Sequence, residues 1–182
     1  YRDRLAQFRA ALPAAHADAL TEVAAKALFK LMAFKDEYEV ARLHRDPAFA
    51  EMLAQEFEPG FKINYHMAPP IVSLRKDARG RPVKRAFGAW FTPVLTALSK
   101  LRPLRGTALD VFSYTQERRE EVALIRWYEA LLAELPAKTC ETTVETVQNL
   151  LALPMDIRGY GPVKHAAIEQ ARAEEARLRK SL

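Results

Sequence analysis

Apolar residues recur every three or four positions along most of this chain, and this period limits what the chain can fold into. Residues 19–34 and 115–135 carry it most clearly. The apolar positions are Leu20, Val23, Ala24, Ala27, Leu28 and Leu31 in the first run, and Val122, Leu124, Ile125, Trp127, Tyr128, Leu131 and Leu135 in the second. A helix with one such stripe buries it against other elements, so we expect a helical core.

Proline and polar cap residues mark where further helices begin. Asp46-Pro47 supplies a capping carboxylate and then proline at the first helical position, and Thr92-Pro93 repeats this arrangement. Val94, Leu98 and Leu101 lie on one face of the helix that follows Thr92, and Pro103 ends that helix. We therefore predict helices that start near residues 47 and 93.

Similar signals divide the C-terminal third. Thr115 is a candidate cap for the long helix, and Thr142 with Glu145 fits a capping box. The glycines of residues 159–161 followed by Pro162 predict the start of a last helix. That helix has few large apolar residues, so we expect it to lie largely on the surface.

The period changes once, between residues 61 and 87. Phe61, Ile63, Tyr65 and Met67 alternate with polar residues, which is typical of a half-buried strand. Residues 71–74 and 83–87 are expected to form two short strands around a turn at 77–80. The predicted fold class is therefore mainly α, a helical domain with one small antiparallel β element around residues 61–87.

Length and composition fit one folded domain. The chain has 182 residues, of which 49% are hydrophobic and 28% charged, as in ordinary globular proteins. We expect a single α-rich domain over residues 1–182, and because the chain starts at Tyr1, a fragment of a longer multidomain chain. No apolar run reaches the ~20 residues that span a bilayer, so we expect no membrane partner and a cytoplasmic location. A single cysteine, Cys140, excludes a disulfide framework within one chain.

The positive charge is concentrated in one segment. The chain carries 28 Lys+Arg against 23 Asp+Glu, a net charge of +5. Residues 75–105 hold nine bases and one acid, Asp77, so that segment has a charge of +8 and the remainder of the chain −3. The binding candidates in this segment are Arg75, Lys76, Arg79, Arg81, Lys84 and Arg85.

Guanidinium groups bind phosphate or carboxylate, so this segment can meet an acidic partner. The nearby Phe87, Trp90 and Phe91 can stack on nucleic-acid bases or belong to the core. A solvated loop, or contacts with acids of the same protein, would also account for the charge. These alternatives stay open at the level of sequence.

Other candidate residues are scattered. His66 precedes a Pro-Pro turn, which could hold its imidazole for acid–base or binding work, or it shares a polar strand face. Asp36 and Glu37 could hold a cation or the basic segment, or form a solvated helix end. Cys140 lies in a threonine-rich helix start that can lower a thiol pKa. No metal-ligand spacing or catalytic signature occurs, so we predict no catalytic residue and no metal site.

Five strings occur in order: KLMAFKDEYEVARL (30–43), HMAPP (66–70), KRAFGAW (84–90), LRGTALD (104–110) and IRGYGPVK (157–164). Together they resemble the C-terminal domain of the large, fused indolepyruvate ferredoxin oxidoreductases, a branch of the 2-oxoacid:ferredoxin oxidoreductases. The resemblance covers roughly residues 20–170.

The resemblance implies a parent enzyme that oxidatively decarboxylates an aryl 2-oxoacid. Such enzymes use thiamine diphosphate with Mg²⁺, 4Fe-4S clusters and CoA as substrate, and pass electrons to ferredoxin. Those cofactors belong to other domains of the parent, and no catalytic residue is carried over to this chain. We expect a non-catalytic accessory domain that packs on other domains of a homo-oligomeric parent or docks ferredoxin. The alternatives are a nucleic-acid-binding module and an enzyme centred on His66.

Overall fold

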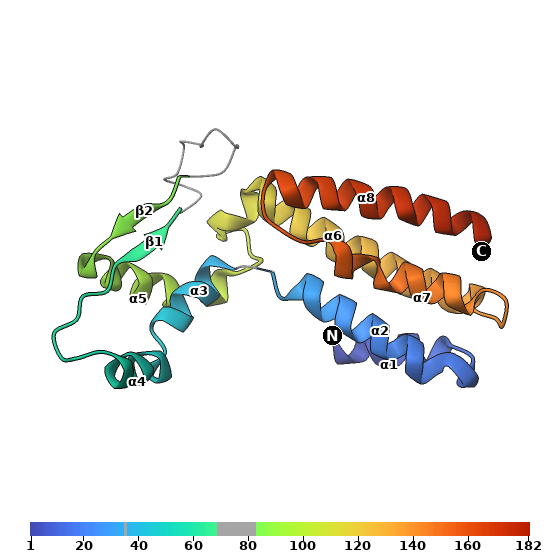
Figure 1. The fold of residues 1–182 in the computed structure, drawn as a ribbon, viewed down its shortest axis with the longest axis horizontal. Helices are drawn as coiled ribbons and strands as arrows, with labels where there is room; N and C mark the ends of the chain where they lie inside the picture. Colours follow the sequence, from blue (N-terminus) through green and yellow to red (C-terminus); the bar gives the residue numbers. More distant parts are fainter. Residues whose placement is uncertain (35, 69–82) are drawn as a thin grey trace. The chain divides into compact units, whose positions relative to one another are not determined.

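The computed structural model describes residues 1–34, 36–68 and 83–182. The chain, predicted to be one domain, groups into two compact units: unit 1 (1–34 and 119–182) and unit 2 (35–118). The described residues form eight α-helices and one two-stranded antiparallel sheet (Figure 1). The prediction of a mainly α fold with one small β element is confirmed.

Unit 1 is a helical bundle built from both ends of the chain. Its helices are α1 (Arg2–Ala11), α2 (Ala14–Met32), most of α6 (Gln116–Glu134), α7 (Val144–Ala152) and α8 (Pro162–Leu178). The 3-10 turns η4 (Leu135–Lys138), η5 (Leu153–Asp156) and η6 (Arg179–Ser181) follow α6, α7 and α8. Helix α2 packs on α1 and α7, and α7 packs on α8. Segments far apart in sequence therefore share one core (Figure 1).

The apolar stripes predicted from sequence form that core. Leu20, Leu28 and Leu31 of α2 are buried, as are Tyr128 and Leu131 of α6. Burying one such side chain stabilises a fold by about 1.5–3 kcal/mol. The helical period thus identified the main hydrophobic cluster of unit 1.

One carboxylate is buried between α6 and α8. The Trp127 indole N–H donates to Glu175 Oε2 at 2.8 Å, and Arg179 Nε donates to Glu175 Oε1 at 2.9 Å. The Arg172 guanidinium lies 4.4 Å from the centre of the Trp127 ring. Helix α8 is largely exposed, as expected, but it also closes the bundle with a satisfied polar contact.

Two local predictions in unit 1 have different outcomes. Gly161, with φ +56°, caps α8, and a Cβ on Gly159 (φ +91°) would lie 2.7 Å from Val163 Cγ1, so the glycines do form a helix start. The capping box at Thr142 is wrong, because α7 begins one residue later, after Thr143. The Thr143 hydroxyl donates to the carbonyl of Lys138 at 2.6 Å instead of capping α7.

The described part of unit 2 contains three short α-helices and the sheet. Its elements are α3 (Glu37–His44), α4 (Pro47–Glu56), β1 (Tyr65–Met67), β2 (Arg85–Phe87), η1 (Ala89–Phe91), α5 (Thr92–Lys100), η2 (Arg102–Leu104) and η3 (Val111–Tyr114). Helix α3 packs against α5. The Ala48 N–H donates to Asp46 Oδ1 at 3.1 Å, which confirms the predicted cap of α4.

The sheet differs from the predicted hairpin. Strand β2 pairs with β1, in the register Tyr65↔Phe87, His66↔Ala86 and Met67↔Arg85. The strand predicted at residues 71–74 lies outside the described residues. The alternation predicted for β1 holds at Tyr65, which is buried, and at His66, which is exposed. Tyr65 forms a small second core with Ala41 of α3 and Leu95 of α5.

Candidate docking surface and buried polar cluster

A cluster of charged and polar side chains, built around the buried Asp36 and Asp110, lies in unit 2 where α3 meets the segment after α5. We call it the polar cluster; its members are Asp36, Glu37, Tyr38, Arg105, Gly106, Asp110 and Arg118. Two of the five family-like strings, 30–43 and 104–110, supply all of these residues except Arg118. The strings therefore meet in space although they are far apart in sequence.

Asp36 anchors one half of the polar cluster. It is only 4% exposed and caps α3, because its Oδ1 accepts the Tyr38 N–H at 3.1 Å. Arg105 Nη1 lies 3.1 Å from Asp36 Oδ2, and Arg118 Nη2 lies 3.4 Å from Oδ1. Arg118 also donates to Glu37 Oε2 at 2.5 Å. The buried carboxylate is thus compensated by two guanidinium groups.

Asp110 anchors the other half. It is 1% exposed; its Oδ2 accepts the Gly106 N–H at 2.9 Å, and its Oδ1 accepts the Phe112 N–H at 3.1 Å. The Tyr38 hydroxyl donates to the same Oδ1 at 3.0 Å. This carboxylate closes the 106–112 turn on itself and ties it to α3.

The polar cluster has the properties of a structural support. Burial, followed by the bond to Asp110, raises the pKa of Tyr38 to about 12, so its phenol stays a donor. Burial opposes ionisation of Asp110, but hydrogen bonds from Gly106, Tyr38 and Phe112 hold the pKa of Asp110 below its usual value. Asp36 and Asp110 each contact more than one segment of unit 2, so the polar cluster holds this part of the fold together.

The outcome for the predicted basic segment is mixed. Arg75, Lys76, Arg79 and Arg81 lie outside the described residues. At the other end of the segment, two bases face acids of α3: Arg105 contacts Asp36, and Arg102 Nε lies 3.8 Å from Glu39 Oε2. Asp36 therefore holds part of the basic segment, one of the two roles considered for it, and is not a solvated helix end.

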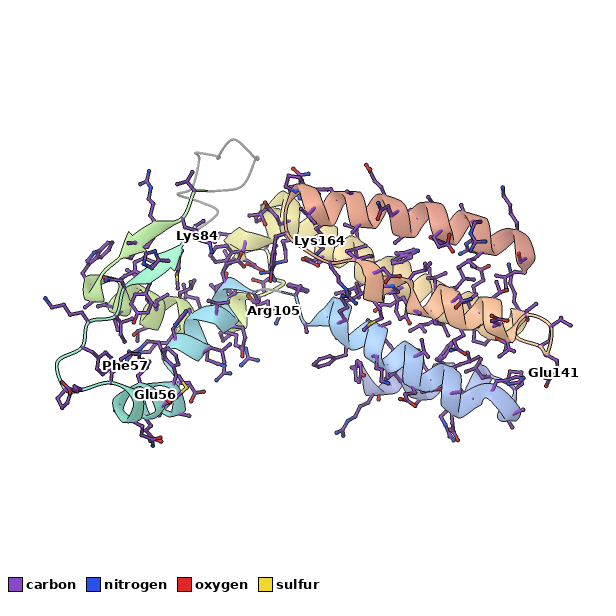
Figure 2. The ribbon with its side chains drawn as sticks, in the orientation of Figure 1. Glu56, Phe57, Lys84, Arg105, Glu141 and Lys164 are labelled. Atoms are coloured by element: carbon purple, nitrogen blue, oxygen red, sulfur yellow. The ribbon has the colours of Figure 1, made fainter. Side chains whose placement is uncertain are left out.

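Three described bases of the segment remain available to a partner. Lys84, Arg85 and Lys100 are exposed, and none of them forms an ion pair within the described part of the chain. Lys84 stands at the start of β2 (Figure 2), and Lys100 ends α5. These bases keep their charge directed at solvent.

His66 lies at the centre of β1, opposite Ala86 of β2. Its side chain is exposed, and no hydrogen bond to its ring occurs among the described residues. A role of His66 in acid–base or binding work stays a prediction.

The apolar face of α5 is only partly covered. Leu95 and Leu98 pack into the second core of unit 2. Val94 and Leu101, predicted on the same face as Leu98, are each 45% exposed, and Trp90, one turn before Val94, is 67% exposed. The helical period groups apolar residues on one face but does not indicate how much of that face other elements cover.

The exposed tryptophan is held in place by its neighbours. Its ring lies edge-on to Phe87, 5.8 Å between centroids, and to Phe91 at 5.6 Å. Phe87 and Phe91 stack on each other at 4.5 Å. We group the exposed apolar residues with the three exposed bases as the α5 surface; it consists of Lys84, Arg85, Trp90, Val94, Lys100 and Leu101.

Cys140 is exposed in the loop before α7. Its Sγ lies 3.2 Å from Thr142 Oγ1 and 3.3 Å from Thr143 Oγ1, and hydrogen bonds from these residues, Thr142 first, lower the thiol pKa to about 7. The Thr143 proton is already donated to the Lys138 carbonyl. Thr142 is therefore the side chain that stabilises the thiolate.

This geometry predicts the pH dependence of Cys140 alkylation. The thiolate is the nucleophile, so the rate with iodoacetamide should rise through an inflection near pH 7 and level off above it. Thr142→Val should move the inflection towards the ordinary thiol range, whereas Thr142→Ser should leave it in place. Rates measured from pH 5 to 10 by mass spectrometry test this; an unmodified chain with its inflection near pH 9 would contradict it.

None of the helices in the described residues is long and apolar enough to cross a membrane. No group of three or more His, Cys, Asp or Glu side chains in that part of the chain is arranged to hold a metal ion.

Comparison with known proteins gives one match. A family model described as a family of unknown function (DUF6537) matches residues 1–177 and so spans both units. Neither the curated proteins nor the solved structures contain a match to the chain. Since the family model covers nearly the whole sequence, the chain belongs to the family of unknown function DUF6537.

Proposed function

We propose that this chain is a non-catalytic accessory domain of a cytoplasmic enzyme similar to indolepyruvate ferredoxin oxidoreductase, and that it docks a protein partner through the α5 surface. The observation that carries the proposal is that unit 2 exposes the apolar side chains of Trp90, Val94 and Leu101 together with three bases that have no ion pair among the described residues. An aromatic and aliphatic centre with Arg and Lys around it is typical of protein interfaces.

The composition of the α5 surface favours an acidic protein over a phosphate group. Val94 and Leu101 offer nothing to a phosphate, so CoA phosphates account for the bases but not for these apolar side chains. An acidic electron carrier such as ferredoxin, or an acidic face of another domain of the parent, would use both. Opposite charges would mainly raise the association rate, and salt would weaken the effect.

The chemistry of the proposed parent belongs to its other domains. By the resemblance, these hold thiamine diphosphate with Mg²⁺ and the 4Fe-4S clusters, and they bind CoA. The donor set of this chain does not fit a cluster, because a cluster needs four thiolates and the chain has one cysteine. The proposed contribution of the domain is therefore docking, and packing within a homo-oligomeric parent.

Reversing the charges of the α5 surface tests the proposal in the full-length enzyme. Lys84→Glu, Arg85→Glu and Lys100→Glu together should raise the Michaelis constant for ferredoxin about tenfold at low salt and leave kcat nearly unchanged. The effect should shrink as salt rises, since screening removes long-range attraction. Initial rates of 2-oxoacid-dependent ferredoxin reduction, measured at two salt concentrations, give the Michaelis constant and its dependence on salt.

A charge-matched variant of unit 1 is the control. Arg2, Arg126 and Lys180 are exposed and have no ion pair among the described residues, so their replacement by Glu changes the net charge equally away from the α5 surface. Equal effects of the two triple variants would show that only net charge matters. An unchanged Michaelis constant for ferredoxin at low salt would end the docking proposal.

Nucleic-acid binding is the second candidate, favoured by the exposed Trp90 ring and by the exposed bases Lys84 and Arg85, which precede it in the sequence. It requires binding of a single-stranded oligonucleotide that weakens steeply with salt and on Trp90→Ala. A titration at about 50 mM salt that gives no shift would exclude this candidate in practice. The aliphatic residues of the α5 surface make the protein partner the better match.

A further inference from the structure

A second apolar surface of unit 2 lies on α4. No residue of this helix is buried, although it carries an apolar stripe. Met52, Phe57 and Phe61 are each about half exposed, and the rings of Phe57 and Phe61 pack on each other with centroids 5.6 Å apart. Helix α4 and the segment after it therefore leave these apolar side chains largely uncovered.

The charged residues next to these side chains in the sequence are mainly acids. Glu51, Glu56 and Glu58 are exposed, and none of them forms an ion pair in the part of the chain that is described. One exposed base, Lys62, follows Phe61. We call this the α4 surface; its members are Glu51, Met52, Glu56, Phe57, Glu58 and Phe61.

The α4 and α5 surfaces are complementary. Each combines three large exposed apolar side chains with three charged groups that lack a partner among the described residues, negative on α4 and positive beside α5. Figure 2 places Glu56 at the end of α4 and Lys84 at the start of β2, well apart within unit 2. The charges of the two surfaces are therefore not neutralised within one copy.

We propose that the α4 surface of one copy of this chain docks on the α5 surface of a second copy. A second copy satisfies both surfaces at once, which an acidic partner or a nucleic acid bound to α5 would not. Because the two surfaces differ, the contact either closes reciprocally in a dimer or continues from copy to copy. The small number of apolar residues indicates a weak contact, of the size class that binds transiently.

The proposed self-association uses the same α5 surface as the proposed partner docking. It therefore rests on the proposed function in one respect, namely that the α5 surface is not covered within one copy of the chain. The α4 surface belongs to self-association alone. Changes on α4 therefore test this inference without touching the docking proposal, whereas changes beside α5 affect both.

Charge reversal with rescue gives the test, by sedimentation velocity of the whole chain over a concentration series at low salt. The unchanged chain should show a sedimentation coefficient that rises with concentration. Glu51→Lys, Glu56→Lys and Glu58→Lys together should weaken association at least tenfold, and so should Lys84→Glu, Arg85→Glu and Lys100→Glu. An equimolar mixture of the two triple variants should associate again, because opposite charges face each other in the mixed contact.

The control reverses three acids of unit 1, Asp3, Glu145 and Glu169, which are exposed and unpaired within the described residues. That variant should associate like the unchanged chain. If circular dichroism shows that a triple variant does not fold, the single variants Glu56→Lys and Lys84→Glu are used in its place. They are measured first separately and then as an equimolar mixture. A chain that stays monomeric throughout, or a mixture that shows no recovery, overturns the inference.

The same variants separate this inference from the docking proposal. The α4 triple variant should lose self-association and keep its Michaelis constant for ferredoxin. If self-association is absent while the ferredoxin constant responds to the α5 variant, only the second-copy contact fails. If self-association is present and the ferredoxin constant does not respond, only the docking proposal fails.

Discussion

Asp110→Ala should lower the free energy of unfolding of unit 2 by about 3–5 kcal/mol, because hydrogen bonds to a buried carboxylate contribute about 1.5–3 kcal/mol each. The substitution removes the acceptor of three donors, the Gly106 and Phe112 amides and the Tyr38 hydroxyl. It also leaves Arg118 with less compensating charge nearby. Since domains are stable by only about 5–15 kcal/mol, unit 2 should be close to unfolding.

Two milder variants calibrate this prediction. Asp110→Asn keeps one acceptor oxygen and should cost less, and Tyr38→Phe removes a single bond and should cost about 1.5–3 kcal/mol. Urea titrations followed by hydrogen exchange at the Gly106, Phe112 and Tyr38 amides measure the three effects within unit 2. A loss below 1 kcal/mol for Asp110→Ala would mean that the polar cluster is not what holds the 106–112 turn.

The ionisation of Asp110 gives the sign of the pH dependence. Its pKa is lower in the folded chain than the ordinary 3.8, so its stabilising contribution is complete above that value and is lost as the pH falls through the folded pKa. Asp110→Asn should lack this part of the acid destabilisation. The stability difference between the two chains should accordingly shrink below about pH 4.

Leu150→Ala should destabilise unit 1 by about 3–4 kcal/mol, since a fully buried leucine loses both its apolar contacts and the volume it filled. Leu150 lies in α7, which packs on α2 and α8, so the cavity would open at the centre of the bundle. The fluorescence of the buried Trp127, recorded in a Trp90→Phe background, reports the unfolding of this unit.

The same substitution at an exposed leucine is the matched control. Leu101→Ala, on the α5 surface, should change stability by less than about 0.5–1 kcal/mol. Equal effects at Leu101 and Leu150 would contradict the assignment of inner and outer positions. A small loss of stability on Leu101→Ala would also show that Leu101 contributes little to the fold and is available to a partner.

The polar cluster and the α5 surface are linked by chain connectivity. Helix α5 ends at Lys100, and η2 leads directly to Arg105, which contacts Asp36 at the start of α3. Helix α3 packs on α5, and this contact joins the segment that follows the C-terminal end of α5 to the N-terminal end of α3. The buried charges thereby fix the helix that carries part of the proposed docking surface.

Sequence alone predicted the helical core well and the candidate site poorly. The stripes around Leu28 and Leu131, the cap at Asp46 and the glycines before α8 depend on local period and local backbone geometry, and the structure confirms them. The strand partner of β2 depends on a pairing across a long connection, for which the sequence contains no local signal.

The positions of the charges could be predicted from the sequence, but their partners could not. Nine bases between residues 75 and 105 are visible in the sequence, and so is their excess over acids. That Arg102 and Arg105 face Glu39 and Asp36, while Lys84, Arg85 and Lys100 stay exposed, follows from the packing of α3 on α5. A count of charges gives their sum but not their partners, because ion pairs form between residues some 60 positions apart.

The sequence by itself determined which segments are helical, that the fold has one small sheet, and where positive charge is concentrated. These properties are set by the order of neighbouring side chains along the backbone. Only the tertiary structure decided that Asp36 and Asp110 are buried supports and that Trp90, Val94 and Leu101 face outward. Burial depends on which elements pack together. The sequence alone does not distinguish an apolar residue that faces the core from one that faces a partner.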